Sequence, residues 1–227
     1  MTVIVFDLDD TLYEEIDFVK SGFDKVSKFL FKNYHISKDE CYQNMIHELG
    51  KGRGKIFDNT LKKYNIFTQK LLRQCISIYR LHKPKICLFD DAEKCLRQFN
   101  TFPMYIVTDG NKIVQKNKLQ ALKLEKIVKF SFITSNYGLK NSKPSTYCFL
   151  KICKLENTSP ENIVYIGDDP SKDFVEIKKI GFKTIRVLTG KFKNKKYSNY
   201  YDADLTIKSL KELSVKKIIK LMENNSK

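Results

Sequence analysis

The sequence predicts an α/β protein in which a parallel sheet with helices on both faces, a three-layer core, is interrupted by an all-helical insertion. Short apolar runs alternate with segments of helical periodicity from about residue 88 onward, and the chain also opens on such a run. This alternation is typical of parallel strands joined by right-handed helical crossovers. Residues 14–87 instead show helical periodicity without a clear strand pattern. We therefore assign residues 1–13 and 88–227 to the core and residues 14–87 to the helical domain.

The first thirteen residues, MTVIVFDLDDTLY, place three carboxylates directly after an apolar run. Val3–Phe6 predicts a buried strand of a parallel sheet. Ligands of such sheets bind beyond the carboxyl ends of the strands, where Asp7 and Asp9 fall. Because three acids within four residues repel one another, a cation or a shared proton is expected among them. Taken alone, the segment fits either a metal-bound pair with one nucleophilic carboxylate, or a helix N-cap or acidic turn after a strand.

The helical insertion contains a glycine-rich loop that has two interpretations of equal weight. Apolar residues recur every three or four positions from Ile16 to Leu30, and a second helix is predicted over residues 38–49 with Ser37 as its cap. One or two further helices follow between residues 56 and 79. The loop Gly50–Lys55 alternates glycines with cations. It is either a flexible basic loop in solvent or a loop that presents Arg53 and Lys55 to an anionic substrate.

From Leu88 onward the predicted elements alternate. A helix opens at Asp90, residues 112–123 form a helix with Ile113, Leu119 and Leu122 inward, and Lys143-Pro144 starts another. Asp169 is predicted to cap the helix that Gly181 ends, and Ser209–Glu212 is a capping box that opens the last helix. The expected strands are residues 104–107, 130–133, 162–166, 183–188 and 204–207.

Composition excludes several classes of protein. The 227 residues carry a formal net charge of +16, yet residues 14–87 contribute +7 (15 basic, 8 acidic) and residues 178–227 contribute +10 (14 basic, 4 acidic). This peripheral excess is better explained by a biased genome than by a nucleic-acid surface, and the basic, aromatic stretch Lys191–Tyr201 is expected to be a solvated loop.

No apolar run is long enough to span a membrane, and the start does not resemble a signal peptide. Six scattered cysteines predict free thiols in a reducing cytoplasm.

Polar side chains converge where the predicted strands end. Asp7 and Asp9 follow the first strand, Thr108 the second, and Asp168 and Asp173 the fourth, while Lys143 precedes a helix. Parallel strands place these ends on one edge of the sheet. The oxygen ligands, without histidine or cysteine, point to magnesium. The histidines all lie in the helical insertion and are given no role.

Four segments together resemble the haloacid dehalogenase superfamily. They are FDLDDTL at residues 6–12, VTDGN at 107–111, Lys143-Pro144, and GDDPSKD at 167–173, in the family's order. The resemblance implies a Rossmann-like core, with the helical insertion as a cap domain. It also implies that Asp7 attacks phosphorus to form an aspartyl-phosphate, while Asp9 protonates the leaving alcohol and then activates water.

The same resemblance assigns the other site residues. Mg²⁺ is expected on Asp7, the backbone carbonyl of Asp9, and Asp168, with Asp173 either orienting the metal shell or ligating through water. Thr108 and the backbone N–H groups of Asp109 and Gly110 are expected to bind the phosphoryl oxygens, which Lys143 neutralises. Asp173 as a helix cap or salt-bridge partner is an equal alternative. Asp10 is expected to be structural, bonding the loop.

The predicted function is a cytoplasmic Mg²⁺-dependent phosphatase acting on a small phosphomonoester, such as a sugar phosphate, sugar-acid phosphate or nucleotide. Asp9 favours phosphoryl transfer over dehalogenation, because similar dehalogenases lack this second acid. A phosphomutase of the same fold is one alternative, and a basic nucleic-acid-binding or scaffold protein is another. Neither membrane nor nucleic acid is expected as a partner, and the chain is expected to be a monomer or a weak homodimer.

Overall fold

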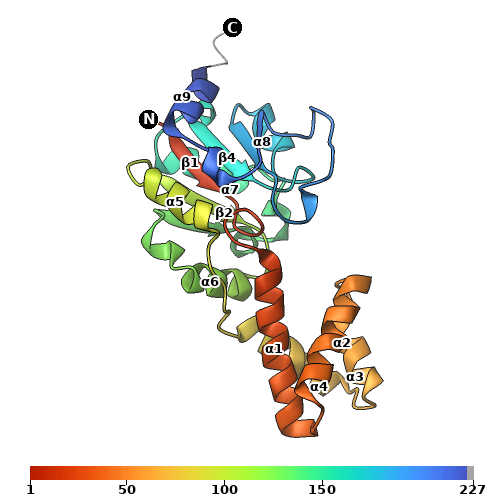
Figure 1. The fold of residues 1–227 in the computed structure, drawn as a ribbon. Coiled ribbons are helices and arrows are strands. Elements are labelled where there is room, and N and C mark those ends of the chain that lie inside the picture. Colours follow the sequence, from red (N-terminus) through yellow and green to blue (C-terminus); the bar gives the residue numbers. More distant parts are fainter. Residues whose placement is uncertain (224–227) are drawn as a thin grey trace. The chain divides into compact units, whose positions relative to one another are not determined.

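The computed structural model describes residues 1–223 and divides the chain into two compact units (Figure 1). The core unit comprises Met1–Glu15 and the chain from Cys87 onward, and the helical unit comprises Ile16–Ile86. The insertion therefore leaves and rejoins the core within two residues of the predicted boundaries.

The core unit is built on a parallel sheet with the strand order β3-β2-β1-β4-β5-β6 in the described part of the chain. The bounds are β1 Val3–Phe6, β2 Met104–Thr108, β3 Phe130–Ile133, β4 Ile163–Gly167, β5 Lys183–Val187 and β6 Leu205–Ile207. Strand β1 lies between β2 and β4, with Val5 paired to both Tyr105 and Tyr165. This order places side by side the carboxyl ends of β2, β1 and β4, the strands that carry the predicted site residues. The predicted α/β fold is confirmed.

Helices pack on both faces of this sheet. They are α5 Asp90–Gln98, α6 Lys112–Ala121, α7 Tyr147–Leu155, α8 Val175–Lys179 and α9 Val215–Glu223. Val3 and Val5 share one buried cluster with Phe149 of α7 and Ile177 of α8. Because side chains alternate along a strand, the equally buried Ile4 and Phe6 face the opposite side. Both faces of the sheet are therefore covered, as near-continuous apolar strands require.

The predicted start of one helix and the predicted buried face of another are wrong. The helix expected at Lys143 begins at Tyr147, so Lys143 lies in the loop before it. In α6, Ile113 is 41% exposed and Val114 is buried instead. The physical reason is that the Asn111 side chain accepts hydrogen bonds from the N–H groups of Ile113 and Val114, which places Ile113 in the exposed first turn.

The last helix also starts later than predicted. Residues 210–212 form a single 3₁₀ turn, in which Ser209 makes no capping bond with its side chain. Glu212 accepts from the Lys208 N–H, while Ser214 Oγ accepts from the Lys217 N–H at the start of α9. The capping residue of α9 is therefore Ser214, and the predicted capping box is replaced by a local turn.

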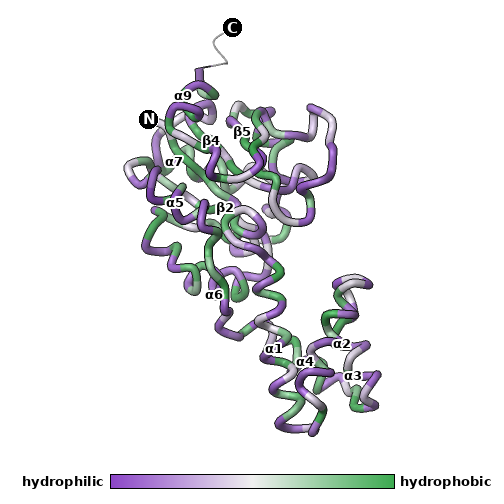
Figure 2. The backbone as a smooth tube through the Cα atoms, viewed as in Figure 1, coloured by the Kyte–Doolittle hydropathy of each residue, from purple (hydrophilic) through white to green (hydrophobic). Residues whose placement is uncertain are grey.

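The helical unit consists of α1 Glu15–Tyr34, α2 Lys38–Lys51, α3 Ile56–Lys63 and α4 Gln69–Leu81, where α1 starts at the last residue of the core unit. Its interior is apolar, with Val19, Phe23, Val26 and Leu30 of α1 on one buried face. Hydrophobic and hydrophilic positions alternate along the helices of this unit (Figure 2). The predicted cap of α2 is confirmed, since Ser37 Oγ accepts from the Glu40 N–H. All regular structure between residues 16 and 86 is helical.

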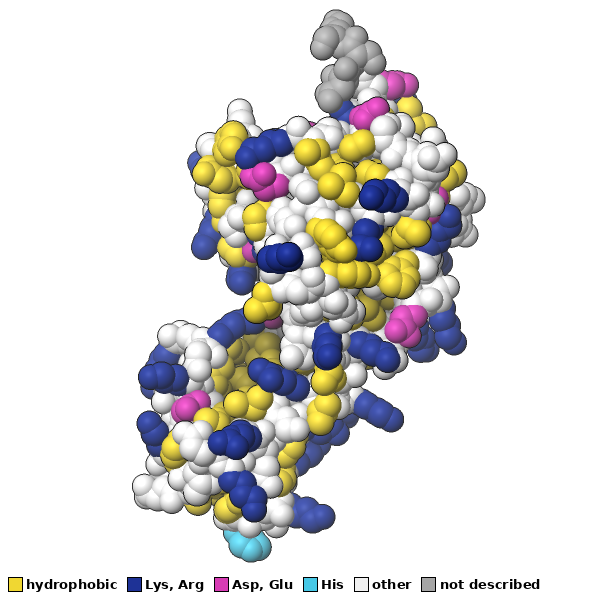
Figure 3. Space-filling model, turned by 180° about the vertical axis from the view of Figure 1, so that it is seen from behind, with side chains coloured by type: hydrophobic (Ala, Val, Ile, Leu, Met, Phe, Trp, Pro, Cys, Tyr) yellow, Lys and Arg dark blue, Asp and Glu magenta, His cyan; other side chains and the backbone are white. Residues whose placement is uncertain are grey.

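The surface is rich in lysine and arginine over both units (Figure 3). The basic stretch Lys191–Tyr201 is tied to the core by Arg186, which donates to the carbonyls of Phe192 and Lys195 and stacks on Tyr197. All six cysteines are free, and four of them are buried. Among the described residues, no helix combines the length and apolar character that crossing a membrane would need.

Candidate active site

The carboxylates at the end of β1 lie between the ends of β2 and β4. The Asp7 N–H donates to the Ile166 carbonyl at 2.8 Å, so Asp7 still follows the sheet register. Thr108 is the last residue of β2, and Asp168 comes directly after β4. The structure thus brings Asp7, Thr108 and Asp168 to one edge of the sheet, as adjacent parallel strands require.

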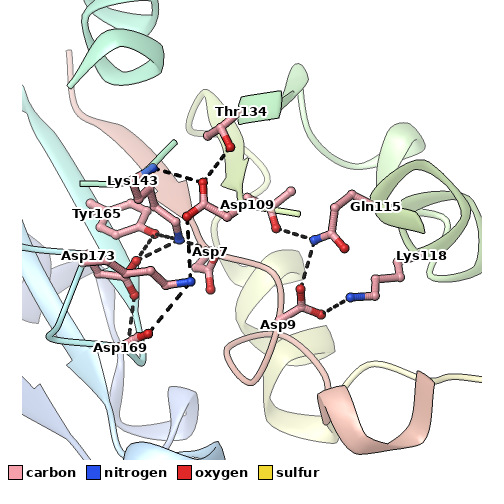
Figure 4. Close-up of polar contacts among 12 residues, drawn as sticks. Asp7, Asp9, Asp109, Gln115, Lys118, Thr134, Lys143, Tyr165, Asp169 and Asp173 are labelled. Carbon is pink, nitrogen blue, oxygen red and sulfur yellow. Dashed lines mark hydrogen bonds and ion pairs between the residues drawn. The ribbon is translucent and has the colours of Figure 1, made fainter. Parts of the chain in front are cut away.

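Lys143 joins the elements of this site through its buried ammonium group (Figure 4). Its Nζ donates to Asp7 Oδ1 at 2.7 Å, to Asp173 Oδ1 at 2.8 Å and to the Tyr165 hydroxyl at 2.9 Å. Burial acts to lower the pKa of Lys143, but the carboxylates of Asp173 and Asp7 raise it well above its usual value. Lys143 is therefore a permanent cation between two acids.

The lysines at this site do not balance its carboxylates, because Lys143 is already bonded to two of them and Lys172 lies 3.9 Å from two others, Asp109 and Asp169. Asp7, Asp168 and Asp173 are buried, and one oxygen from each lies within 4.8 Å of the others. Burial raises the pKa of Asp7 to about 6 and, with the charges of Asp7 and Asp173, raises the pKa of Asp168 to about 9. Three buried carboxylates around one lysine are stable as anions only with further positive charge. This all-oxygen donor set fits Mg²⁺.

The turn after β4 orients these acids. Asp173 Oδ2 accepts from the Asp169 N–H at 3.0 Å, so Asp173 closes the turn as well as pairing with Lys143. A Cβ on Gly167 would approach Asp173 Oδ2 to 2.5 Å, which explains the glycine there. Asp169 does not cap α8, which begins six residues later. Its Oδ1 instead accepts from the N–H and hydroxyl of Ser171, because a short polar side chain closes a local turn more readily.

The loop after β2 presents the residues predicted to bind the phosphoryl group. Thr108 is buried, and its Oγ1 lies 2.6 Å from Gln115 Nε2. Asp109 Oδ1 accepts from the Thr134 hydroxyl at 2.6 Å and from the Lys143 N–H at 3.1 Å. The Asp109 side chain therefore fixes the Lys143 loop. Gly110 has a φ of +133°, a conformation that favours glycine.

Asp9 is held by residues that the sequence analysis did not single out. Its carboxylate accepts hydrogen bonds from Lys118 at 2.7 Å, from Gln115 at 2.9 Å and from the Tyr13 hydroxyl. Burial acts to raise the pKa of Asp9, but Lys118, Tyr13 and Gln115 together lower it below its usual value. A sequence signal existed, because Gln115 and Lys118 lie three residues apart on the buried face of α6.

Asp10 makes the structural bonds that were expected of it. Its Oδ1 accepts from the Glu15 N–H at 2.9 Å, and its carbonyl accepts from the Thr189 hydroxyl. Its φ is +57°, a conformation that asparagine and aspartate tolerate better than most residues. The partner Thr189 comes from the loop after β5, which sequence patterns do not link to the first strand.

A polar cavity of about 160 Å³ opens at this edge of the sheet. It is lined by Asp7, Asp9, Asp10, Glu15, Thr108, Asp109, Asp168, Asp169, Lys172, Lys191 and Phe192. Lys172 and Lys191 are the cations in this lining, and Lys172 was not singled out from the sequence. Lys191 begins the stretch Lys191–Tyr201, which was expected to be a solvated loop, but the structure places Lys191 and Phe192 at this cavity. The volume suits a phosphoryl group and little more, so the rest of a substrate would extend outside it.

Arg53 and Lys55 belong to the other unit. They lie between α2 and α3 and are exposed. Arg53 lines a cavity of about 260 Å³ within the helical unit, together with aliphatic and aromatic residues that include Phe23, Phe57 and Tyr79. Lys55 is at the N-cap position of α3 without a capping side chain. Their predicted contact with substrate stays a prediction.

Known relatives share most of the length of this chain. A glyceraldehyde 3-phosphate phosphatase of Methanocaldococcus jannaschii is 30% identical over 220 residues, which covers 92% of this chain and 94% of the relative. The phosphatase of the same name from Pyrococcus furiosus is 26% identical over 97% of this chain and 91% of its own length. A mouse N-acylneuraminate-9-phosphatase is 22% identical over 75% of each chain.

Solved structures share the fold at lower identity. A HAD phosphatase from Thermococcus onnurineus has a TM-score of 0.62 at 22% identity and covers 96% of this chain and 98% of that one. A 2-haloacid dehalogenase from Pseudomonas syringae has a TM-score of 0.64 at 16% identity, with 99% of both chains covered. The fold alone therefore accommodates both kinds of chemistry.

A family model confirms the resemblance drawn from the four motifs. The model of the haloacid dehalogenase-like hydrolases matches residues 4–187, a range that contains every motif residue from Phe6 to Asp173. With the phosphatase relatives, this match also confirms the expected class of enzyme, a hydrolase of phosphoric monoesters. The chain belongs to the haloacid dehalogenase-like hydrolase family.

Proposed function

We propose that this protein is a Mg²⁺-dependent phosphatase that hydrolyses a small sugar phosphate through a phosphorylated Asp7. The observation that carries the proposal is the buried group of Asp7, Asp168 and Asp173 around Lys143, beside the Thr108 loop. A carboxylate cluster that its lysines compensate only in part, next to donors for phosphoryl oxygens, suits a dianionic ester together with a divalent cation.

The metal would be held by Asp7 and Asp168, by the backbone carbonyl of Asp9, and by Asp173 directly or through water. When bound there, Mg²⁺ shields the negative charge of the nucleophile from that of the phosphoryl group. Asp173 is also bonded to Lys143, Tyr165 and the Asp169 N–H. These bonds fit a residue that orients the site, and they favour that role over a direct ligand.

The chain's own residues carry the two chemical steps. A carboxylate oxygen of Asp7 attacks phosphorus, and the bond from phosphorus to the ester oxygen breaks. Lys118, Tyr13 and Gln115 favour the ionised form of Asp9 in the free site. The negative charge of the bound ester favours the protonated form, in which Asp9 gives its proton to the leaving alcohol. Water then attacks the phosphorus of the aspartyl-phosphate, and Asp9 takes the proton as inorganic phosphate leaves. Lys143 keeps the Asp7 carboxylate in place during both steps and balances charge on the phosphoryl oxygens.

Glyceraldehyde 3-phosphate is the first candidate substrate, on the strength of the relatives that bear its name at 25–30% identity. Arg53 and Lys55 are proposed to contact the substrate from the helical unit, whose net positive charge favours an anion.

The proposal is tested by measuring phosphate release, with Mg²⁺ or with chelator, from a panel of phosphomonoesters. The panel contains glyceraldehyde 3-phosphate, a sugar-acid phosphate, a nucleoside monophosphate and 4-nitrophenyl phosphate. We expect Mg²⁺-dependent release, greatest for a small sugar phosphate, and none from Asp7→Asn. In Asp9→Ala with 4-nitrophenyl phosphate, mass spectrometry should find phosphate on Asp7. Absence of hydrolysis across the panel, or phosphate on another residue, would contradict the proposal.

A further inference from the structure

Helix α6 directs two buried polar side chains at the first strand's loop. Gln115 is 1% exposed and Lys118 is 3% exposed, on the same face as the buried Val114 and Leu119. Gln115 Nε2 lies 2.9 Å from Asp9 Oδ2, and Lys118 Nζ lies 2.7 Å from Asp9 Oδ1 (Figure 4). Burying an amide and an ammonium is costly unless both are bonded. Each oxygen of Asp9 is thus engaged by a different residue of α6.

The contact with Asp9 fixes which way the Gln115 amide faces. An ionised carboxylate only accepts hydrogen bonds, and a protonated Asp9 directs its one proton at the leaving alcohol, so in both forms the amide nitrogen, and not the oxygen, points at Asp9. The same nitrogen lies 2.6 Å from Thr108 Oγ1. Since an amide nitrogen has two hydrogens, it donates one to Asp9 and the other to Thr108. Thr108 therefore accepts at this bond, and its own hydroxyl proton is left to be donated elsewhere.

Gly110 holds the Gln115 side chain in that position. A Cβ at residue 110 would lie 3.1–3.2 Å from the Gln115 side chain, so the amide packs directly against the loop that follows β2. The φ of Gly110, +133°, is one that other residues rarely adopt. The glycine thus lets the loop turn and lets Gln115 pass beside it to reach both Thr108 and Asp9.

We propose that Gln115 and Lys118 are positioning residues for phosphoryl transfer. Together they hold the Asp9 carboxylate where it serves the leaving alcohol, and Gln115 turns the Thr108 hydroxyl proton toward the phosphoryl oxygens. This inference rests on the proposed phosphatase function. Both residues lie on α6, outside the four motifs. Lys118 acts on Asp9 alone, whereas Gln115 acts on both Asp9 and Thr108.

The two effects separate by leaving group. An alkyl ester such as glyceraldehyde 3-phosphate needs its leaving oxygen protonated, so it depends on a well-placed Asp9. An aryl ester such as 4-nitrophenyl phosphate leaves as a stable phenolate and depends on Asp9 far less. Both esters need Thr108 equally. Replacing Lys118 should therefore lower kcat/KM mainly for the alkyl ester. Replacing Gln115 should lower kcat/KM for both esters, and more for the alkyl ester.

The test compares kcat/KM for these two esters in Lys118→Met and Gln115→Glu. The first removes the ammonium at similar length, and the second is an isostere that replaces the two donated hydrogen bonds with a carboxylate that repels Asp9. We expect each variant to lose at least tenfold more kcat/KM on the alkyl than on the aryl ester. Exposed positions of the same helix supply matched controls, Lys116→Met and Gln120→Glu, which should stay within twofold of wild type on both esters.

Each outcome decides the inference. If the wild type hydrolyses both esters and a variant loses the same factor of kcat/KM on each, the positioning role is overturned and the proposed function stands. Failure of the wild type to hydrolyse either ester overturns the proposed function, and this inference with it. Thermal melting of each variant identifies any that do not fold, and if Lys118→Met is one of them, the isosteric Gln115→Glu still decides. Asp9→Asn should show the same leaving-group pattern as Lys118→Met and at greater size.

Discussion

The ammonium nitrogen of Lys143 lies 2.7 Å from Asp7 Oδ1, although 136 residues separate the two along the chain. The same nitrogen lies 2.8 Å from Asp173 Oδ1. This lysine is the point at which the β1, β2 and β4 loops meet, since the Asp109 carboxylate also accepts from its backbone N–H.

Replacing Lys143 with methionine should remove both activity and stability. Loss of the cation leaves the carboxylates of Asp7 and Asp173 buried without their partner, and breaking a buried pair in this way costs about 3–5 kcal/mol. We expect kcat to fall by about 10²–10³-fold, as for the loss of one preorganised charge. Urea unfolding and steady-state kinetics measure the two effects. Lys140→Met, at an exposed position three residues earlier, should change neither.

Asp168→Asn and Asp169→Asn should differ sharply, although the residues are adjacent. Asp168 belongs to the carboxylate group proposed to hold Mg²⁺, while Asp169 bonds Ser171 in a local turn. Asp168→Asn should raise the Mg²⁺ concentration for half-maximal activity by tenfold or more, and excess Mg²⁺ should restore part of the rate. Asp169→Asn should change that concentration less than threefold. A similar shift in both variants would argue against Asp168 as a ligand.

The metal-free protein should lose stability as pH rises. Burial raises the pKa of Asp168 to about 9 and that of Asp7 to about 6, whereas unfolded carboxyl groups titrate near 4. Between about pH 4 and 9 the folded state keeps protons that the unfolded state has released, so the free energy of unfolding falls with pH, by up to about 1.4 kcal/mol per unit for one group.

Urea unfolding in chelator from pH 5 to 9 measures this slope. Asp168→Asn is the control, since it removes the main titrating group and should flatten the curve above pH 6. Because Mg²⁺ binds the ionised carboxylates, saturating Mg²⁺ should stabilise the wild type more at pH 8 than at pH 6. A metal-free stability that is the same in wild type and Asp168→Asn at every pH would contradict the raised pKa.

Gly167→Ala should disturb the site through one atom. The new Cβ would lie 2.5 Å from Asp173 Oδ2, and that carboxylate is already bonded to Lys143, Tyr165 and the Asp169 N–H. Overpacking of this kind costs about 1–3 kcal/mol. We expect a lower melting temperature and weaker Mg²⁺ binding, measured as a higher Mg²⁺ concentration for half-maximal activity. Gly54→Ala, where the added Cβ meets nothing within 4 Å, is the matched control and should melt as the wild type does.

Arg53→Ala and Lys55→Ala should act on substrate binding alone. If these exposed cations contact the substrate beyond its phosphoryl group, KM for glyceraldehyde 3-phosphate should rise by tenfold or more while kcat changes little. KM for 4-nitrophenyl phosphate, which lacks the sugar portion, should change less than threefold. Equal increases for both substrates would show a general effect of charge in place of a specific contact.

Much of the core could be predicted because its signals are local. The apolar run Phe130–Ile133 forms strand β3 with the predicted bounds, and the cap at Ser37 follows from a residue preference at one helix start. The convergence of Asp7, Thr108 and Asp168 also follows from the pattern, because parallel strands have only one edge at which their carboxyl ends can meet.

Where the predictions were wrong, a competing local bond decided the outcome. Asp169 and Asn111 both have side chains that bond nearby N–H groups, and the sequence does not show which N–H group each will choose. Asp169 bonds Ser171 and leaves the start of α8 to Phe174, while Asn111 caps α6 and exposes Ile113.

The sequence by itself determined the fold class, the family and the acids that the strands deliver, because strand periodicity and motif order are properties of neighbours along the chain. Only the tertiary structure decided which polar groups those acids bond. Gln115 and Lys118 reach Asp9 across more than 100 residues, and Thr189 reaches Asp10 across 179. Such pairings arise when helices and loops pack against the sheet, and burial then obliges each polar group to find a partner.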